Sequence, residues 1–191
     1  SLPRERRARA APALPGAPCR AAAVLDSRDR LGDLAREIAK AQDVIYIGRA
    51  GQPIALEGAL KLKELSYIHA DGLAAGELKH GTIALIEDGV PVIVIAPSDS
   101  LFAKTASNMQ EVVARGARVV FFSDAAGIEQ LGDLAAATIE LPTVDPFVAP
   151  ILYAIPVQLL AYHVAVIKGT DVEGLVQAEV DALELDLEEL A

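Results

Sequence analysis

The side chains best suited to acid–base chemistry gather between residues 57 and 80. Glu57, Lys61 and Glu64 stand at positions i, i+4 and i+7, so on a helix they share one face. A lysine one turn from a carboxylate favours its ionised form, which is the form that can act as a general base. The same spacing is typical of a salt-bridge ladder on a solvated helix face, and the pattern alone leaves both interpretations open.

His80 is the second candidate for proton transfer. It follows Gly76-Glu-Leu-Lys79 and precedes Gly81, which predicts a helix end or a loop. Imidazole titrates near neutral pH and can both give and take a proton, although an ordinary loop histidine would fit the same pattern. The other two histidines, His69 and His163, are expected to be structural. No grouping of His, Cys and Asp has the spacing of a metal site, so neither a metal nor a cofactor is expected.

A glycine-containing turn, Gly48-Arg49-Ala50-Gly51, follows a β-branched run that begins at Asp43. Glycines let the backbone approach closely, so the amide groups of such a turn can bind an anion at a helix N-terminus. We therefore name Gly48, Arg49 and Gly51 as candidates for substrate binding, on a pattern of low specificity. A tight turn between a strand and a helix explains the same residues equally well.

The elements that must position these residues alternate between strand and helix. Short, nearly continuous apolar runs are typical of strands in a parallel sheet buried on both faces, and the helices between them would cover those faces. Such sheets bind ligands beyond the carboxyl ends of their strands. The expected strands are residues 43–48, 91–97, 117–123 and 137–142, and the expected helices are about residues 27–40, 54–68, 101–115, 128–134 and 150–167.

The composition of the 191 residues favours one globular domain. Hydrophobic residues make up 52% of the chain and aromatic residues 4%, which predicts an aliphatic core and speaks against a wholly disordered chain. The single cysteine excludes an intrachain disulfide framework and a zinc module with several cysteines. The net charge of −10 argues against a general nucleic-acid binder.

The charge is concentrated at the two ends. Residues 171–191 hold eight acids and no base, whereas residues 1–20 hold five arginines and one glutamate. The arginine-rich start shares features with a transit peptide, but a linker or an incomplete helix is the preferred interpretation. An amphipathic stripe predicts a helix at residues 175–190, although a frayed, solvated end would suit them as well. The stripe consists of Val176, Val180, Leu183, Leu187 and Leu190.

Residues 147–167 carry no formal charge over 21 positions, which is long enough to span a bilayer. However, Pro150, Pro156, Gln158 and His163 interrupt this stretch. A helix buried inside an α/β domain, or at an oligomer interface, accounts for it better. No membrane partner is therefore expected.

A long motif gives the chain a specific resemblance. Residues 54–69, IALEGALKLKELSYIH, run directly into residues 70–81, ADGLAAGELKHG. Together they resemble the C-terminal sugar isomerase (SIS) domain of the glutamine–fructose-6-phosphate aminotransferase family, also called glucosamine-6-phosphate synthases. The likeness extends over about residues 24–172. Shorter matches lie at residues 91–97, 107–108, 111–112, 114–116, 158–163 and 168–172.

The resemblance implies an α/β fold, a three-layer αβα sandwich with a five-stranded parallel sheet of the flavodoxin-like kind. Residues 24–172 would form the SIS domain. Residues 1–23 would be a linker or incomplete helix from a missing preceding domain, and residues 173–191 an atypical acidic tail. The resemblance also implies a cytoplasmic protein that forms a homodimer.

The activity implied by the resemblance is a step in amino-sugar biosynthesis. Family members make glucosamine 6-phosphate from fructose 6-phosphate and glutamine, and their isomerase part opens the ketose ring, forms an imine and moves a proton between C1 and C2. By resemblance, Glu64 is the glutamate that shuttles this proton, and Lys61 is a lysine close to it. His80 matches a histidine that assists ring opening and reaches the site from a neighbouring subunit.

The chain departs from the family in what surrounds these residues. The glutaminase domain and the first isomerase domain, with its Ser/Thr-rich sugar-phosphate loop, have no counterpart, and no lysine follows Lys168 to form the imine. The turn at residues 48–53 is one residue shorter than usual, and Thr82 replaces the usual proline. We therefore expect an enzyme fragment that does not complete the synthase reaction alone.

The alternative function is a non-catalytic sugar-phosphate-binding or assembly module of the same fold. A stand-alone phosphosugar isomerase and a membrane protein rank behind it.

Overall fold

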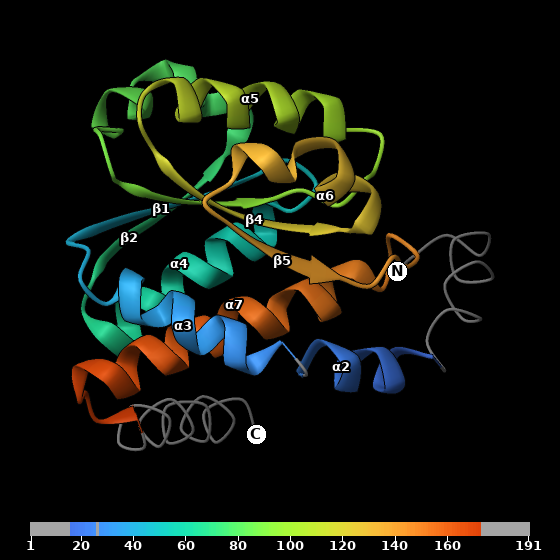
Figure 1. Ribbon diagram of the computed structural model, residues 1–191, viewed down its shortest axis with the longest axis horizontal. Coiled ribbons are helices and arrows are strands. Elements are labelled where there is room, and N and C mark those ends of the chain that lie inside the picture. Colours follow the sequence, from blue (N-terminus) through green and yellow to red (C-terminus); the bar gives the residue numbers. More distant parts are fainter. Residues whose placement is uncertain (1–15, 26, 173–191) are drawn as a thin grey trace, which may run out of the picture.

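A five-stranded, all-parallel sheet forms the middle layer of the protein, as the computed structural model in Figure 1 shows. The structure describes residues 16–25 and 27–172. The strands are β1 Asp43–Gly48, β2 His69–Ala74, β3 Pro91–Ile95, β4 Arg118–Asp124 and β5 Ala137–Leu141. They lie side by side in the order β2-β1-β3-β4-β5. The predicted five-stranded parallel sheet is confirmed.

Helices cover both faces of this sheet, so the predicted three-layer αβα sandwich is also confirmed. The helices are α2 Ala17–Leu25, α3 Arg28–Ile38, α4 Gln52–Ser66, α5 Phe102–Ala114, α6 Ala125–Leu131 and α7 Ala149–Lys168. Three short 3-10 helices are η2 Ala75–His80, η3 Thr82–Leu85 and η4 Gly132–Leu134. In Figure 1, α3, α4 and α7 lie on one face of the sheet, and α5 and α6 lie on the other.

The side chains of β1 show how the sheet divides the core in two. Tyr46 belongs to the apolar cluster that α3, α4 and α7 share with the sheet, whereas Ile45 and Ile47 belong to the cluster that includes α5 and η2. This follows from the strand geometry, because successive side chains point to opposite faces. Both faces of the strand are buried, which is why continuous apolar runs predicted the inner strands.

The edge strand β2 is the one that the apolar runs did not predict. It pairs only with β1, and most of its residues are half-exposed, so its sequence need not be apolar. Helix α4 passes directly over it: a β-carbon on Gly72 would lie 2.7 Å from Leu56 Cα and 2.8 Å from the carbonyl oxygen of Ala55. Because only glycine permits so close an approach, Gly72 sets the position of α4 on the sheet.

The predicted helix at residues 128–134 begins three residues earlier than expected, at Ala125. Asp124 caps it, since its side chain accepts a hydrogen bond from the N–H of Gly127. The last part of the predicted helix is the separate 3-10 turn η4. The other predicted helices and strands are found within two residues of their expected bounds.

Helix α7 is the apolar helix that the uncharged stretch predicted. By length and composition it could cross a membrane, but it packs along α3 and α4 and buries eight of its residues. The hydroxyl of Thr170 donates a hydrogen bond of 2.6 Å to the carbonyl oxygen of Leu65, which joins the ends of α7 and α4. α7 is thus the core helix against which α4 is held.

The chain before the first strand also contacts α7. Helix α2 packs against it, and Val24 is 2% exposed. The guanidinium of Arg20 donates a hydrogen bond of 2.8 Å to the carbonyl oxygen of Thr143. Part of the segment interpreted as a linker or an incomplete helix is therefore helical and packed on the domain. The helix predicted at residues 175–190 lies outside the described residues.

Candidate functional site

Lys61 and Glu64 form an ion pair on the second half of α4. Lys61 Nζ lies 3.1 Å from Glu64 Oε2, and the side chains are 23% and 37% exposed. The helix brings them together because residues three apart are neighbours on its surface. A carboxylate that is paired and yet partly open to solvent can still reach a substrate, as a general base must.

Glu57 does not extend this pair into a ladder of equivalent charges. Its Oε1 accepts a hydrogen bond of 2.9 Å from Gln158 Nε2, on α7. Glu57 therefore joins α4 to α7, while Glu64 is left with its lysine. The structure separates a bridging carboxylate from a candidate base that the helical spacing alone treated alike.

His80 ends η2, where a helix end or loop was predicted. Its side chain is 75% exposed, and its Nε2 lies 4.0 Å from Glu77 Oε2. η2 is anchored through Ala75 and Leu78 in the apolar cluster on the α5 side, whereas α4 belongs to the cluster on the opposite side. No hydrogen bond or ion pair joins His80 to Glu64 within the described residues. His80 and Glu64 thus belong to segments that pack against opposite faces of the sheet.

The other two histidines contact side chains of neighbouring residues in the fold. His69 Nδ1 lies 2.7 Å from Asp43 Oδ1, so the first residues of β2 and β1 are tied together. The ring of His163 contacts that of Tyr162 edge-on at 5.6 Å between centroids. Across the part of the chain that the structure describes, no three His, Cys, Asp or Glu side chains are grouped to hold a metal ion.

Gly48, Arg49 and Gly51 lie at the carboxyl end of β1, as predicted. A β-carbon on Gly48 would lie 2.6 Å from the carbonyl carbon of Gly51, so the turn is too tight for a side chain there. Arg49 Nε and Nη2 donate long hydrogen bonds of 3.4 and 3.2 Å to Asn108 Oδ1, on α5. The arginine thus points toward α5, and the two glycines shape the strand–helix turn.

A cavity of about 290 Å³ lies beyond the carboxyl ends of β1, β3, β4 and β5. Its polar wall is built around Asp124, which is 3% exposed. Asp124 Oδ2 accepts hydrogen bonds from the amide of Ser98 at 3.1 Å and from its hydroxyl at 2.6 Å, and Oδ1 accepts one from the amide of Gly127 at 3.0 Å. Parallel sheets bind ligands at this end, and among the described residues that line this cavity there is no lysine or arginine.

Tyr153 also lines this cavity, from the first turns of α7. Burial raises the pKa of its phenol, and the charges of Asp124 and Asp99 raise that pKa further. The phenol is therefore neutral at physiological pH and can act as a hydrogen-bond donor. Sequence analysis missed Ser98, Asp124 and Tyr153, although the first two directly follow predicted strands, which is a signal that could have found them.

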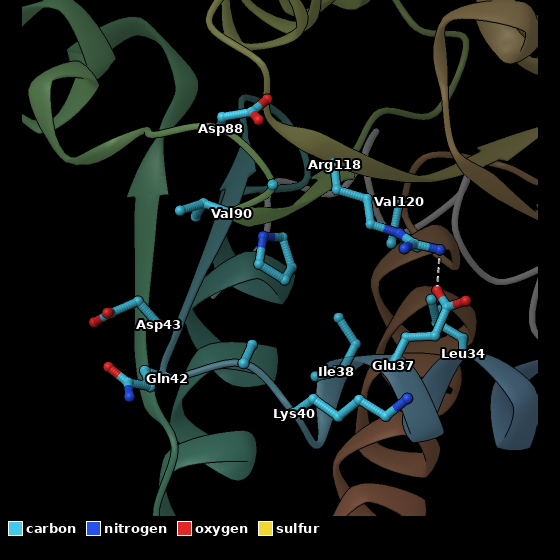
Figure 2. A pocket seen from close by; sticks show the side chains of 13 residues that line it. Leu34, Glu37, Ile38, Lys40, Gln42, Asp43, Asp88, Val90, Arg118 and Val120 are labelled. Atoms are coloured by element: carbon cyan, nitrogen blue, oxygen red, sulfur yellow. Dashed lines mark hydrogen bonds and ion pairs between the residues drawn. The ribbon is translucent and has the colours of Figure 1, made fainter.

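A second cavity, of about 350 Å³, opens at the opposite end of the strands (Figure 2). Leu34 and Ile38 of α3 and Val120 of β4 form its apolar part, and Glu37 forms an ion pair with Arg118 at its rim. None of the predicted site residues lines it. Because it lies at the amino-terminal ends of the strands, it is not where a parallel sheet usually binds its ligand.

Comparison with known proteins identifies the family. The family model "SIS domain" matches residues 37–168. The chain is 61% identical over 158 residues to the glutamine–fructose-6-phosphate aminotransferase [isomerizing] of Zymomonas mobilis, and covers 26% of that protein. It is 62% identical over 141 residues to the aminotransferase of the same name from Sphingobium yanoikuyae, and covers 90% of the sequence given for it.

A solved structure gives the same assignment. The C-terminal domain of glucosamine-fructose-6-phosphate aminotransferase from Francisella tularensis superposes with a TM-score of 0.84 at 41% sequence identity. The match covers 90% of this chain and 48% of that one. The chain itself spans about a quarter of the length of the Zymomonas relative, 26%. The predicted resemblance is confirmed for the fold and for the kind of domain.

Proposed function

The chain belongs to the SIS domain family, and we propose that it acts as the second isomerase half-domain of a glucosamine-6-phosphate synthase. In this role it binds fructose 6-phosphate and carries out the proton transfer that converts the ketose into an aldose. Its partners are a glutaminase domain, a first isomerase domain and a second copy of the same chain. The whole assembly works in the cytoplasm.

The ion pair of Lys61 with Glu64 is the observation that carries the proposal. At 3.1 Å from its lysine and 37% exposed, the Glu64 carboxylate has one cation beside it and an open side toward solvent. A carboxylate in this setting removes the proton from C1 of the open-chain ketose and returns it to C2. Lys61 offsets the charge that develops on the substrate oxygen during this transfer.

His80 supplies the O–H proton transfer that opens the ketose ring. Its 75% exposure leaves the imidazole free to enter a neighbouring molecule. Its segment is anchored on the α5 side of the sheet and α4 on the other, so the histidine acts on the sugar that is bound at Glu64 of a second chain. The complete site therefore needs at least two copies of the chain.

The test uses Glu64→Gln in a polypeptide that joins this chain to a first isomerase domain. We expect kcat for fructose 6-phosphate isomerisation to fall by about 10²–10⁴ because the amide cannot take up the C1 proton. Glu57→Gln is the matched control, since Glu57 lies on the same helix and bonds to Gln158. Retained turnover in Glu64→Gln, at unchanged circular dichroism, would show that Glu64 is not the base.

The cavity beside Asp124 favours a second candidate, a non-catalytic sugar-phosphate-binding or assembly module. Among the described residues its lining holds Ser98, Asp99 and Asp124, which can bind the hydroxyl groups of the sugar, and no lysine or arginine, so the phosphate group would have to extend out of the cavity. Titration of the isolated chain with fructose 6-phosphate and glucosamine 6-phosphate distinguishes the two. Saturable binding that Asp124→Asn abolishes and Glu64→Gln spares would favour the module. Loss of binding in Glu64→Gln alone would favour the isomerase.

A further inference from the structure

A row of polar side chains on α5 contacts three separate segments of the chain. Asn108 and Glu111 lie on α5 at positions i and i+3, and Arg115, at position i+7, caps its C-terminal end, so the three lie along one side of the helix. Asn108 binds the arginine of the turn after β1, Glu111 pairs with Lys79 of η2, and the guanidinium of Arg115 donates to the carbonyl oxygen of Ile83 in η3 at 2.9 Å. Of these segments, η2 ends at His80 and η3 begins two residues after it.

We propose that this row, which we call the α5 row, positions His80 for the neighbouring chain. The inference rests on the proposed function, in which His80 acts across a subunit boundary. The proposal assigns a role to Asn108 and Glu111, which lie in the short matches at residues 107–108 and 111–112 and have no role in the proposed chemistry. Both residues act through His80 and are positioning residues.

The first contact of the row fixes the start of η2. Asn108 is 4% exposed, and its Oδ1 accepts from Arg49 Nε and Nη2. The guanidinium lies directly over Gly76: a β-carbon there would be 3.1 Å from Nη1, 3.2 Å from Nη2 and 3.3 Å from Cζ. Arg49 is thus held between α5 and the backbone of η2, and the absence of a side chain at Gly76 lets it pack so closely.

The second contact lies one residue before the histidine. Lys79 Nζ is 2.8 Å from Glu111 Oε1, with the side chains 64% and 27% exposed. The other oxygen of Glu111, Oε2, is buried and has no hydrogen-bond partner. A buried, unpaired carboxylate oxygen is unfavourable and calls for an explanation. The ion pair of Glu111 Oε1 with Lys79 offsets part of this cost and so keeps the carboxylate in place.

The contacts leave the imidazole free while they hold the backbone around it. Leu78 is fully buried, Lys79 is paired, and beyond the histidine the carbonyl of Ile83 is bonded to α5. Between them stands Gly81, whose φ of 135° is a conformation that residues with a side chain rarely adopt. Because glycine is the least restricted residue, the contacts on both sides hold the backbone in this conformation. An immobile backbone with an exposed side chain lowers the ordering cost when His80 enters its partner.

The test reverses the charge of Lys79 and of Glu111, singly and together. In the 191-residue chain, Lys79→Glu places two carboxylates side by side, so we expect amide hydrogen exchange in residues 75–83 to rise about tenfold. Thermal unfolding should stay within about 2 °C, because an ion pair this exposed contributes little to global stability. The double variant Lys79→Glu/Glu111→Lys should restore slow exchange. Glu37→Gln is the matched control, because it breaks an ion pair with Arg118 that involves no residue of η2.

A kinetic readout separates positioning from packing. In the polypeptide used to test Glu64, Lys79→Glu should lower kcat about tenfold while KM for fructose 6-phosphate changes less than about twofold, and the double variant should recover most of kcat. Unchanged exchange in Lys79→Glu, or a double variant no better than Lys79→Glu, would overturn the proposal. Failure of Glu64→Gln to affect turnover would overturn the proposed function instead, and the exchange results would still decide the α5 row.

Discussion

The carboxylate of Asp124 joins three parts of the chain at the carboxyl end of the sheet. It accepts three hydrogen bonds, two from Ser98 after β3 and one from the amide of Gly127 in α6. The Asp124→Asn variant keeps the size of the side chain but replaces one acceptor oxygen with an NH₂ group. Whichever way the amide is turned, that group faces a backbone N–H, of Ser98 or of Gly127, that it cannot bond.

The structure sets the size of the loss. If the amide oxygen faces Ser98, the Gly127 amide loses its cap, which typically costs about 1 kcal/mol. At 3% exposure water does not replace the partner, so the loss takes the value for a buried donor left unsatisfied, about 1–3 kcal/mol. We therefore expect Asp124→Asn to lower the free energy of unfolding by about 1–3 kcal/mol.

Urea unfolding at neutral pH, followed by far-UV circular dichroism, measures this loss through the midpoint at constant slope. Asp33→Asn is the control, because Asp33 is 80% exposed and pairs only with Arg36 on the same helix. It should change the free energy of unfolding by no more than about 0.5 kcal/mol. A loss in Asp124→Asn no larger than that of the control would refute the hydrogen-bond reasoning.

Three further predictions concern the sheet and its buried phenols. Gly72→Ala should cost about 1–3 kcal/mol or more in urea unfolding, because its β-carbon would meet the Leu56 backbone at 2.7 Å; an unchanged midpoint would mean that α4 can shift freely on β2. Tyr46→Phe should be neutral or stabilise the protein by up to about 1 kcal/mol, since the Tyr46 hydroxyl is buried without a partner; a large loss would reveal a hydrogen bond at that hydroxyl. Burial raises the pKa of Tyr46, and burial and then the charges of Asp124 and Asp99 raise the pKa of Tyr153. Unfolded phenols lose their protons from about pH 10 while these two stay protonated, so the stability should fall as pH rises above about 10, and less steeply in Tyr46→Phe; equal slopes for both proteins would contradict the assignment.

The proposal that two chains share the site has a consequence for activity. Glu64 and Lys61 belong to a helix on one face of the sheet, and His80 to a segment anchored on the other. Under this proposal, dilution of the protein to a monomer should abolish ring opening before it disturbs the fold. Analytical ultracentrifugation at the assay concentrations would show whether the loss of turnover follows dissociation.

Local patterns were sufficient to predict most of the fold. The inner strands are buried on both faces, so the sequence of each is a nearly continuous apolar run. Three of the four predicted strands are these inner strands. The same holds for the pair of Lys61 and Glu64, whose contact follows from helical geometry alone. The edge strand β2 was the exception, because one paired neighbour and a half-exposed surface allow it a mixed sequence.

The sequence by itself thus determined the order of the helices and of every strand but β2, the helix face that carries Lys61 and Glu64, and, through its long motif, the family. Only the tertiary structure decided which groups the polar side chains meet. Glu57 bonds to Gln158 across 101 positions and Arg49 to Asn108 across 59. The physical reason is that periodicity and capping act over a few neighbours, whereas these partners meet only after the sheet has brought distant segments together. The same packing holds the segments of His80 and Glu64 against opposite faces of the sheet, which is why the proposed chemistry includes a neighbouring chain.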